Sequence, residues 1–389
     1  MAITVETQTS SPAPAYRGVY LDCSSNDVDI VRVIMDVSVN GTFKTTQEKD
    51  PNFGTNNQFE FDVRDLSQDV LDWGIDFDIS TFGIHDQTTA AAQLDFNLFE
   101  VLDTTTGTLS TTWAEDGAGT GAVSGSAVDV VNITLQHEET QNLNAYLMDD
   151  STADGLFLTN KPRGSFEIAE DHAIQLDFVS SLADVSAVME QYQSSTLGTT
   201  TQSSALSPTY SMGYVGIDEA FFDSTTDQVK VKLLSTIDEQ EATLSETITI
   251  NKLTGCTDDY RLIYWENPLG GTDYWYFKGN YQKDSEGDFN GYVKPLSRSF
   301  SVTDRGEGTI RARSNRRETL WSRELSRDEL EWIQEITLQN RNAYIYEGGQ
   351  FVPIIIEDTS GTYVNNLDTV FQFSLTFRYS NEHISQKGE

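Results

Sequence analysis

The chain has 389 residues, 38% of them hydrophobic, and a formal net charge of −36 at pH 7. With 20 Phe, 16 Tyr and 6 Trp, it holds enough apolar side chain to build packed cores without disulfides or structural metals. Its length predicts about two to four domains. An acidic surface repels phosphate at long range, so the composition disfavours sequence-specific binding of nucleic acid by the chain as a whole.

Charge is spread unevenly along the chain. Residues 1–260 hold 10 basic and 42 acidic residues, a net charge of −32, whereas residues 261–389 hold 15 basic and 19 acidic residues, a net charge of −4. Three explanations remain open for the acidic part. They are solubility in a saline habitat, a wall along which DNA slides without adhering, and complementarity to the basic segment of a neighbouring subunit.

Nothing in the sequence predicts a signal peptide or a membrane span. The first 20 residues are polar and rich in Ser, Thr and Pro, without the apolar core of a secretory signal. No stretch reaches the roughly 18 apolar residues that cross a bilayer. Cys23 and Cys256 have no His or Cys at metal-ligand spacing, so two free thiols in a reducing cytosol are expected, with one long-range disulfide as the alternative.

The first region is predicted to be a flexible tail, residues 1–18, followed by a β-sandwich domain, residues 19–114. In residues 28–39 apolar and polar side chains alternate, and Asn40-Gly41 follows, which is a strong hairpin signal. Strands are also expected at residues 59–63 and 94–98, with a short helical turn at 65–73 between them.

A Gly-rich linker at residues 115–127 is predicted to lead into a second β domain at residues 128–259. Residues 194–208 are dominated by Ser, Thr, Gln and Gly, so they are expected to form an exposed loop. The strands of this domain are expected at residues 128–135, 156–158, 173–179, 229–234 and 247–250.

The third region, residues 260–389, combines an aromatic hairpin, a basic segment and a C-terminal α+β unit. Two aromatic runs, residues 261–265 and 274–277, flank a Pro- and Gly-containing turn, which predicts the hairpin. Ser326 and Glu329 are spaced as the capping box of a helix that ends near Asn340.

The last predicted strand, residues 369–379, has the clearest periodicity in the chain. Aromatic and Leu residues occupy every second position, which is typical of a strand with one buried face. Strands are also expected at residues 343–346 and 351–356, joined by Gly348-Gly349. The predicted fold class is mainly β and multi-domain, with β-sandwich-like modules and the C-terminal α+β unit.

Catalytic motifs are missing from the sequence. His137-Glu138 begins like a zinc-protease helix, but Gln141 stands where the second His is needed. There is no phosphate loop ending in Lys-Ser or Lys-Thr, and no Ser at nucleophile-elbow spacing. We therefore expect a non-enzymatic protein without a cofactor.

An alternating polar run raises the question of calcium. Asp284, Glu286, Asp288 and Asn290 are spaced like calcium-loop ligands, but the glycine positions and the missing terminal Glu do not match an EF-hand. A polar hairpin turn is the favoured interpretation, and calcium binding stays open. Asp149-Asp150 with Asp154-Gly155 is a weaker candidate of the same kind.

Two groups of residues are candidates for an interface between subunits. The aromatic hairpin residues are expected to serve a core or an interface, with a sugar-stacking platform as the alternative. The arginine-rich residues 305–327 are expected to include an exposed arm or long loop, because few apolar residues interrupt them, and a protein partner is favoured over DNA. The interface candidates are Arg305, Arg311, Arg313, Arg316, Arg317, Arg323, Trp265 and Trp275.

Residues 261–277, RLIYWENPLGGTDYWYF, contain the pattern WxNxxGGxDxxxF. This pattern resembles one found in virion proteins of tailed bacteriophages that infect Bacteroidetes. The C-terminal unit, with Trp332-Ile333 followed by residues 343–346 and 352–356, is similar to the same group, as are residues 59–71. Together these stretches cover about a third of the chain.

The resemblance implies a tail, neck or baseplate subunit that works by assembly. Such a subunit forms a homo-oligomeric ring, contacts other virion proteins, and resides in the virion after synthesis in the host cytoplasm. The resemblance assigns no catalytic or receptor-binding residue. A different class remains as the alternative: an adhesin or receptor-binding module that recognises surface glycans through exposed aromatic side chains.

Overall fold

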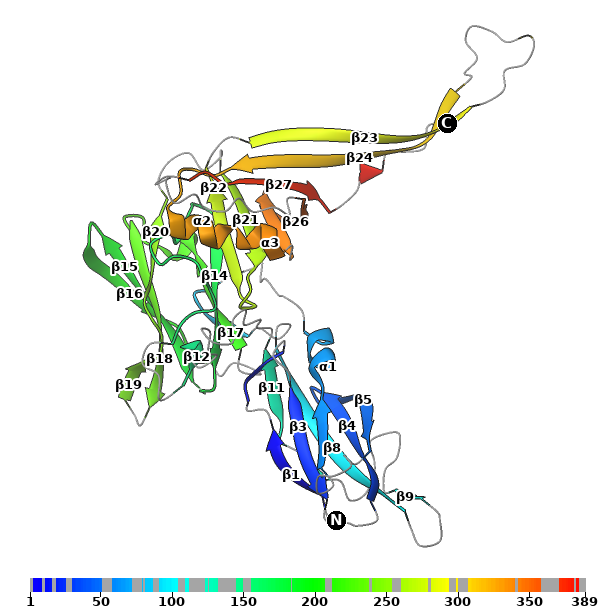
Figure 1. The fold of residues 1–389 in the computed structure, drawn as a ribbon. Helices are drawn as coiled ribbons and strands as arrows, with labels where there is room; N and C mark the ends of the chain where they lie inside the picture. The colour runs from blue at the N-terminus through cyan, green and yellow to red at the C-terminus, as the bar shows by residue number, and fades with distance from the viewer. Residues whose placement is uncertain are drawn as a thin grey trace. The chain divides into compact units, whose positions relative to one another are not determined.

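In the computed structural model the chain is mainly β, with several sheets and little helix, as the sequence predicts (Figure 1). The structure describes residues 3–8, 11–15, 19–25, 30–50, 58–71, 79, 81–86, 91–103, 109–111, 123–124, 126–131, 145–149, 155–182, 184–206, 212–237, 240–253, 260–278, 281–293, 299, 307–339, 342–357, 371–380 and 383–384. The chain divides into two compact units. Unit 1 comprises residues 1–253 and 268–272, and unit 2 comprises residues 254–267 and 273–389.

Unit 1 begins with two sheets that share one apolar core. One sheet has the order β1-β3-β6, and the other has β2-β11-β8-β4-β5, with β9 and β10 also paired to β8. The core takes alternate residues from both sheets, among them Leu21, Phe61, Val37 and Leu94. The bounds are β1 Ile3–Gln8, β2 Ala13–Pro14, β3 Tyr20–Ser25, β4 Ile30–Val39, β5 Thr42–Lys49, β6 Gln58–Asp62, α1 Arg64–Asp69, β8 Ala91–Asp103, β9 Leu109–Thr111, β10 Val123–Ser124 and β11 Val128–Val131.

Local signals placed several of these elements correctly. Asn40 and Gly41 both have positive φ, 50° and 72°, and join β4 to β5 through a two-residue turn, so the predicted hairpin is confirmed. The predicted helical turn is α1.

The flexible N-terminal tail is a wrong prediction. Residues Ile3–Gln8 form β1, which pairs antiparallel with β3, and Ile3 is buried. Ala13–Pro14 forms β2, which pairs with β11. Short polar strands at a sheet edge carry too few apolar residues to show a clear period in the sequence, and long-range pairing orders them.

The rest of unit 1 has two further sheets. One has the order β12-β14-β17-β7, and the other has β13-β20-β18-β15-β16, with β19 paired to β18. Strand β7 comes from the region assigned by sequence to the first sandwich, yet it pairs with β17. The bounds are β7 Gly83–Asp86, β12 Leu147–Met148, β13 Glu167–Ile168, β14 Ala173–Ser180, β15 Val185–Gln193, β16 Thr196–Gln202, β17 Met212–Asp218, η3 Glu219–Phe221, β18 Gln228–Ile237, β19 Gln240–Thr243 and β20 Ile248–Lys252.

The loop expected at residues 194–208 is partly a strand. Residues 196–202 form β16, an edge strand paired with β15. Exposure was predicted correctly, but the strand was missed because both of its faces are exposed, so no apolar residue marks every second position.

Unit 2 is an α+β unit, as predicted. Its sheet has the order β22-β21-β25-β26-β27-β24-β23, with β28 paired to β24, and helices α2 and α3 pack on its apolar core. The predicted capping box is present, since Ser326 and Glu329 bond each other's backbone N–H groups. The bounds are β21 Arg261–Glu266, β22 Thr272–Phe277, β23 Tyr281–Val293, β24 Glu307–Trp321, α2 Arg327–Ile333, α3 Glu335–Gln339, β25 Ala343–Glu347, β26 Gln350–Ile356, β27 Ser374–Tyr379 and β28 His383–Ile384.

Two predicted features of unit 2 are confirmed in detail. Gly348 and Gly349, with φ of 60° and 77°, form the two-residue turn between β25 and β26. In the last strand, Leu375 and Phe377 are fully buried while Ser374 is exposed, so the alternation follows the predicted faces, although β27 begins only at Ser374.

The longest hairpin of the described residues is β23–β24 (Figure 1). Strand β27 pairs with β24 only at Arg317–Trp321, and β28 pairs with it at Arg313 and Ser314. Within the described chain, residues 289–293 and 307–312 therefore form a ribbon of two strands that no third strand supports.

Candidate functional site

The two tryptophans proposed as interface residues belong to the core of unit 2. Trp265 and Trp275 are each 1% exposed. Their ring centroids lie 5.2 Å and 5.6 Å from that of Trp332 on α2. The interface prediction is therefore wrong for Trp265 and Trp275, because the helix covers the face of the hairpin that carries them.

The other aromatic residues of this hairpin are buried as well. Tyr264, Tyr274, Tyr276 and Phe277 are each 1% or 2% exposed. A sugar ring stacks on an aromatic face that solvent reaches, so these side chains offer no sugar-stacking platform. The core interpretation is the correct one for this cluster.

The arginine-rich residues form a strand and not the expected arm or long loop. Residues 307–321 are β24, whose partner β23 carries acidic residues at matching positions. Arg313 stands opposite Asp288, and Arg317 stands opposite Asp284. Opposite charges at directly paired positions, such as Arg317 and Asp284, stabilise a ribbon. Arg311 stands opposite Asn290, and Arg305 lies outside the described residues.

The possible calcium run lies inside a strand, so its interpretation as a hairpin turn is wrong. Residues 284, 286, 288 and 290 all belong to β23. Residues two apart in a strand are separated by about 6.6 Å along its axis, which does not bring four ligands around one ion. Among the described residues, no group of three or more His, Cys, Asp or Glu side chains is placed to hold a metal ion. His137, Asp150 and Asp154 lie outside them.

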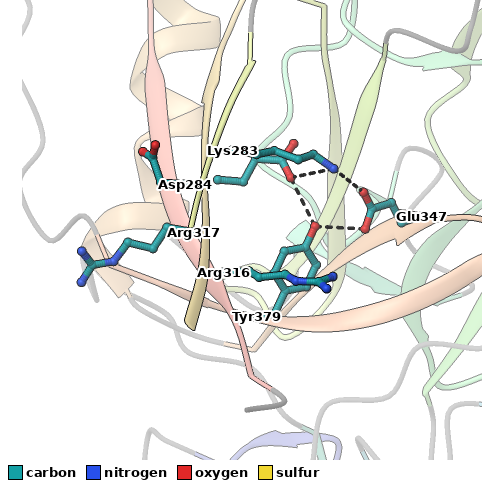
Figure 2. Close-up of a pocket in the computed structure, with 7 residues that line it drawn as sticks. Lys283, Asp284, Arg316, Arg317, Glu347 and Tyr379 are labelled. Atoms are coloured by element: carbon teal, nitrogen blue, oxygen red, sulfur yellow. Dashed lines mark hydrogen bonds and ion pairs between the residues drawn. The ribbon is translucent and has the colours of Figure 1, made fainter. Parts of the chain in front are cut away.

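A polar hollow of about 340 Å³ opens where β23 and β24 meet the rest of the unit 2 sheet (Figure 2). Figure 2 shows Lys283, Glu347 and Tyr379 converging, with Arg317 directed away from them. The hollow is lined by Lys283, Asp284, Arg316, Arg317, Glu318, Glu347 and Tyr379.

The carboxylate of Glu318 organises this hollow. Its side chain is fully buried, and Arg261 Nε lies 3.1 Å from Glu318 Oε1. Lys283 Nζ lies 3.4 Å from Glu318 Oε2, and the Tyr379 hydroxyl donates to the same oxygen at 3.2 Å. Two cations and a hydroxyl donor thus compensate the desolvation of one buried charge.

Glu347 shares two of these donors. Lys283 Nζ donates to Glu347 Oε1 at 3.0 Å, and the Tyr379 hydroxyl lies 3.0 Å from Glu347 Oε2. Strands β23, β24, β25 and β27 each supply one member of this network of Lys283, Glu318, Glu347 and Tyr379. The network therefore fastens the base of the long hairpin to the sheet.

The titration of the network follows from these contacts. Burial, together with the charges of Glu318 and Glu347, raises the pKa of Tyr379 above its usual range. Burial alone would lower the pKa of Lys283, but its hydrogen bond to Glu347 and the two carboxylate charges outweigh burial and raise it. Tyr379 and Lys283 both stay protonated near neutral pH, so neither acts as a base or a nucleophile there.

A third carboxylate, Glu357, lies between two arginines of strands β24 and β27. Arg317 and Arg378 are directly opposed in β24 and β27, an unfavourable pairing of like charges. Glu357 relieves it, because its two oxygens lie 2.7 Å from Arg317 Nε and 3.5 Å from Arg378 Nε. Arg323 is likewise occupied, with its guanidinium 5.3 Å from the Trp275 ring centroid and 3.3 Å from Glu329.

Arg316 differs from its neighbours. It lines the hollow and is exposed, and within the described part of the chain no carboxylate lies within ion-pairing distance of its guanidinium. A planar guanidinium in this setting matches the two oxygens of a carboxylate. The arrangement of the hollow is thus suited to receiving an anionic group at Arg316.

Sequence reasoning found Arg316 and Arg317 but missed Lys283, Glu318 and Glu347. A signal was present, because Glu318 and the fully buried Leu320 share one face of β24 by alternation. A carboxylate in that register is buried and needs cations beside it. Which cations serve it depends on strand order, which the sequence does not state.

No helix in the described part of the chain is long and apolar enough to cross a membrane. The Cys23 thiol is free and buried, and Cys256 lies outside the described residues.

No protein-family model matches the chain, and no curated protein matches it. Among solved structures, it has a likeness to the fibronectin(III)-like modules of Clostridium thermocellum CbhA, at 6% sequence identity over 65% of this chain and 93% of that chain. The TM-score of this likeness is 0.16, which carries no argument about fold or function.

Proposed function

We propose that this chain is a non-enzymatic structural protein of a tailed phage virion, a ring-forming component of the tail, neck or baseplate. It is made in the host cytoplasm and joins copies of itself and other virion proteins. Sequence resemblance supplies the class of particle. One structural observation carries the assembly role: the β23–β24 ribbon that runs beyond the supporting strands.

The ribbon is poorly suited to standing alone. Five residue pairs, from Phe289 with Ala312 to Val293 with Glu307, are held only by each other among the described strands. Val293 is 76% exposed. Isolated two-stranded ribbons are marginally stable in water, so a ribbon of this kind gains stability when a neighbouring subunit supplies a further surface.

The charge distribution supports a contact between the base of this hairpin and an acidic surface of another copy. Arg316 is an exposed cation at the hollow, whereas residues 1–260 of every copy carry a net charge of −32. An ion pair between Arg316 and a carboxylate of the next copy joins unlike parts of two subunits. Such a heterologous contact generates a ring when the rotation between neighbours closes.

The test measures the mass of the purified full-length protein by light scattering at low and high salt, followed by negative-stain imaging of any large species. Arg316→Gln removes the proposed contact. Arg327→Gln removes an equal charge from the same unit and is the control, because Arg327 is 59% exposed and, among the described residues, forms an ion pair only with Glu331 of its own helix.

We expect closed rings at low salt that weaken at high salt and with Arg316→Gln, but not with Arg327→Gln. Salt weakens exposed ion pairs because the Debye length falls from about 30 Å at 0.01 M to about 3 Å at 1 M. A wild-type protein that stays monomeric at every concentration and salt level contradicts the ring proposal. Rings that Arg316→Gln leaves intact contradict only the role of Arg316.

A further inference from the structure

Strand β16 is an open edge of its sheet. It lies at the end of the strand order and pairs only with β15 among the described strands. Six of its seven residues are exposed, and Leu197 is 51% exposed. Thr199 Oγ1 donates to Asp223 Oδ2 at 2.6 Å, which helps to hold the strand in place. One row of backbone N–H and C=O groups is therefore presented outward.

The edge also lies in the longest charge-free stretch of the sequence. Residues 191–217 contain 27 positions without Asp, Glu, Lys, Arg or His, in a chain that is 22% charged with a net charge of −36. Residues 196–202, TLGTTTQ, combine four Thr with Leu and no Pro. Thr is a β-branched residue that favours extended pairing.

Two other edge strands, β23 and β5, carry charges of the kind that normally prevent pairing between sheets. Strand β23 has Lys283 and Asp284 exposed at its edge, and β5 has Lys44, Glu48 and Lys49. Charges, prolines and bulges are the usual protection of a free edge. Strand β16 has no charge and no proline, and a single bulge interrupts its ladder with β15.

We propose that β16 is a self-association surface on which the β16 strand of a second copy pairs antiparallel, about a two-fold axis. A two-fold contact brings the same residues together from both copies, so a charged strand would face an identically charged strand and be repelled by it. Strand β16 has no charge to oppose. In a protein of net charge −36, the residues of this strand therefore add no charge repulsion of their own between two copies.

This surface is independent of the ring proposal and has the opposite salt dependence. Backbone hydrogen bonds and the burial of Leu197 are insensitive to screening, whereas the long-range repulsion between two acidic copies weakens as salt rises. Pairing through β16 therefore strengthens at high salt. The Arg316 contact weakens under the same condition, so high salt isolates the β16 contact.

The experiment uses the full-length protein at high salt and measures its mass as a function of concentration. Thr200→Lys places an ammonium on the edge of each copy. Thr247→Lys is the matched control, because Thr247 is an exposed residue next to β20, a strand that β18 and β15 separate from β16. A second pair, Thr200→Cys and Thr247→Cys, is treated with a short bifunctional maleimide and examined for cross-linked dimers.

We expect a reversible wild-type dimer, a loss of about tenfold or more in its affinity for Thr200→Lys, and no change for Thr247→Lys. Thr200→Cys should cross-link efficiently and Thr247→Cys should not. Two results overturn the proposal: a wild-type protein that remains monomeric at high salt, or equal behaviour of the variants at positions 200 and 247. Neither result bears on rings formed at low salt.

Discussion

Trp332 Nε1 donates a hydrogen bond of 2.7 Å to Asp273 Oδ2, and both residues are at most 3% exposed. Asp273 belongs to the stretch that resembles phage virion proteins, and Trp332 lies on α2. The bond gives this carboxylate a donor inside a core built from aliphatic and aromatic side chains, and it fixes the helix against the hairpin.

The variants Trp332→Phe and Trp265→Phe separate this bond from ring packing. Trp265 packs against Trp332 with their ring planes tilted by 38°, but its own Nε1 has no acceptor among the described residues. Both changes remove a similar volume, and only Trp332→Phe removes a donor from a buried carboxylate. We expect Trp332→Phe to destabilise unit 2 by about 1.5–3 kcal/mol more than Trp265→Phe. Hydrogen exchange of unit 2 peptides measures the difference, and equal losses would contradict the role of the bond.

Glu318→Gln tests the buried centre of the polar network. The change leaves Arg261, which is 15% exposed, and Lys283 without the anion that both contact. Removing one partner of a buried ion pair costs about 3–5 kcal/mol. The matched control is Glu331→Gln, whose side chain is 54% exposed and whose pair with Arg327 contributes at most about 0.5 kcal/mol. Urea unfolding, detected by hydrogen exchange of β24 peptides, should show a large loss of stability only for Glu318→Gln.

The network predicts a loss of unit 2 stability in acid. Burial works to raise the pKa of Glu347, but hydrogen bonds from Lys283 and Tyr379 outweigh it and lower the pKa. A carboxyl with a lowered folded pKa stabilises the fold above its ordinary pKa, and this contribution disappears as the pH falls through the folded value. Glu347→Gln should therefore be less stable than wild type at pH 7, and the gap should shrink at pH 3. A gap of constant size would contradict the linkage.

The raised pKa of Lys283 gives the matching prediction in alkali. A lysine with a raised folded pKa contributes stability that is present below its ordinary pKa and is lost as the pH rises through the folded value. Lys283→Met should flatten the alkaline fall in unit 2 stability, measured by urea unfolding between pH 9 and pH 11.5. An unchanged alkaline slope would show that other groups control it.

Gly271→Ala tests a close backbone approach inside unit 1. A Cβ at position 271 would lie 2.4 Å from the Leu158 carbonyl oxygen, which is backbone and cannot move aside cheaply. We expect a loss of about 1–3 kcal/mol, the usual cost of overpacking. Gly164→Ala is the control, because nothing lies within 4 Å of a Cβ there. Hydrogen exchange of β14 peptides measures the stability of both variants. A Gly271→Ala variant as stable as wild type would contradict the close backbone approach at position 271.

Cys23 should be unreactive in the folded protein. Burial, followed by the charges of Asp22 and Glu6, raises the pKa of its thiol to about 12, so almost no thiolate exists at pH 8. Treatment with iodoacetamide at pH 8, followed by peptide mass spectrometry, should find Cys23 unmodified in native protein and modified in urea. Rapid native labelling would contradict this prediction.

The fold class and the elements with local signals could be predicted from the amino-acid sequence. The alternation of apolar and polar residues predicted the two faces of β27. Residues that readily adopt positive φ predicted the turns at Asn40-Gly41 and Gly348-Gly349, and the capping box predicted where α2 begins. Each signal depends on residues within about four positions of one another, so it is readable without knowledge of the rest of the chain.

Tertiary structure alone decided which strands are neighbours, and with that the nature of the candidate site. Lys283 and Glu347 are 64 residues apart in sequence and meet at 3.0 Å because β23 and β25 converge on the same hollow. Burial of Trp265 and Trp275 required α2 to cover their face. Strand β16 gave no periodic signal because neither of its faces is buried, and only its partner β15 identifies it as an edge. Pairing between distant segments has no local signature, since it is fixed by which apolar faces and charges compensate one another in the folded chain.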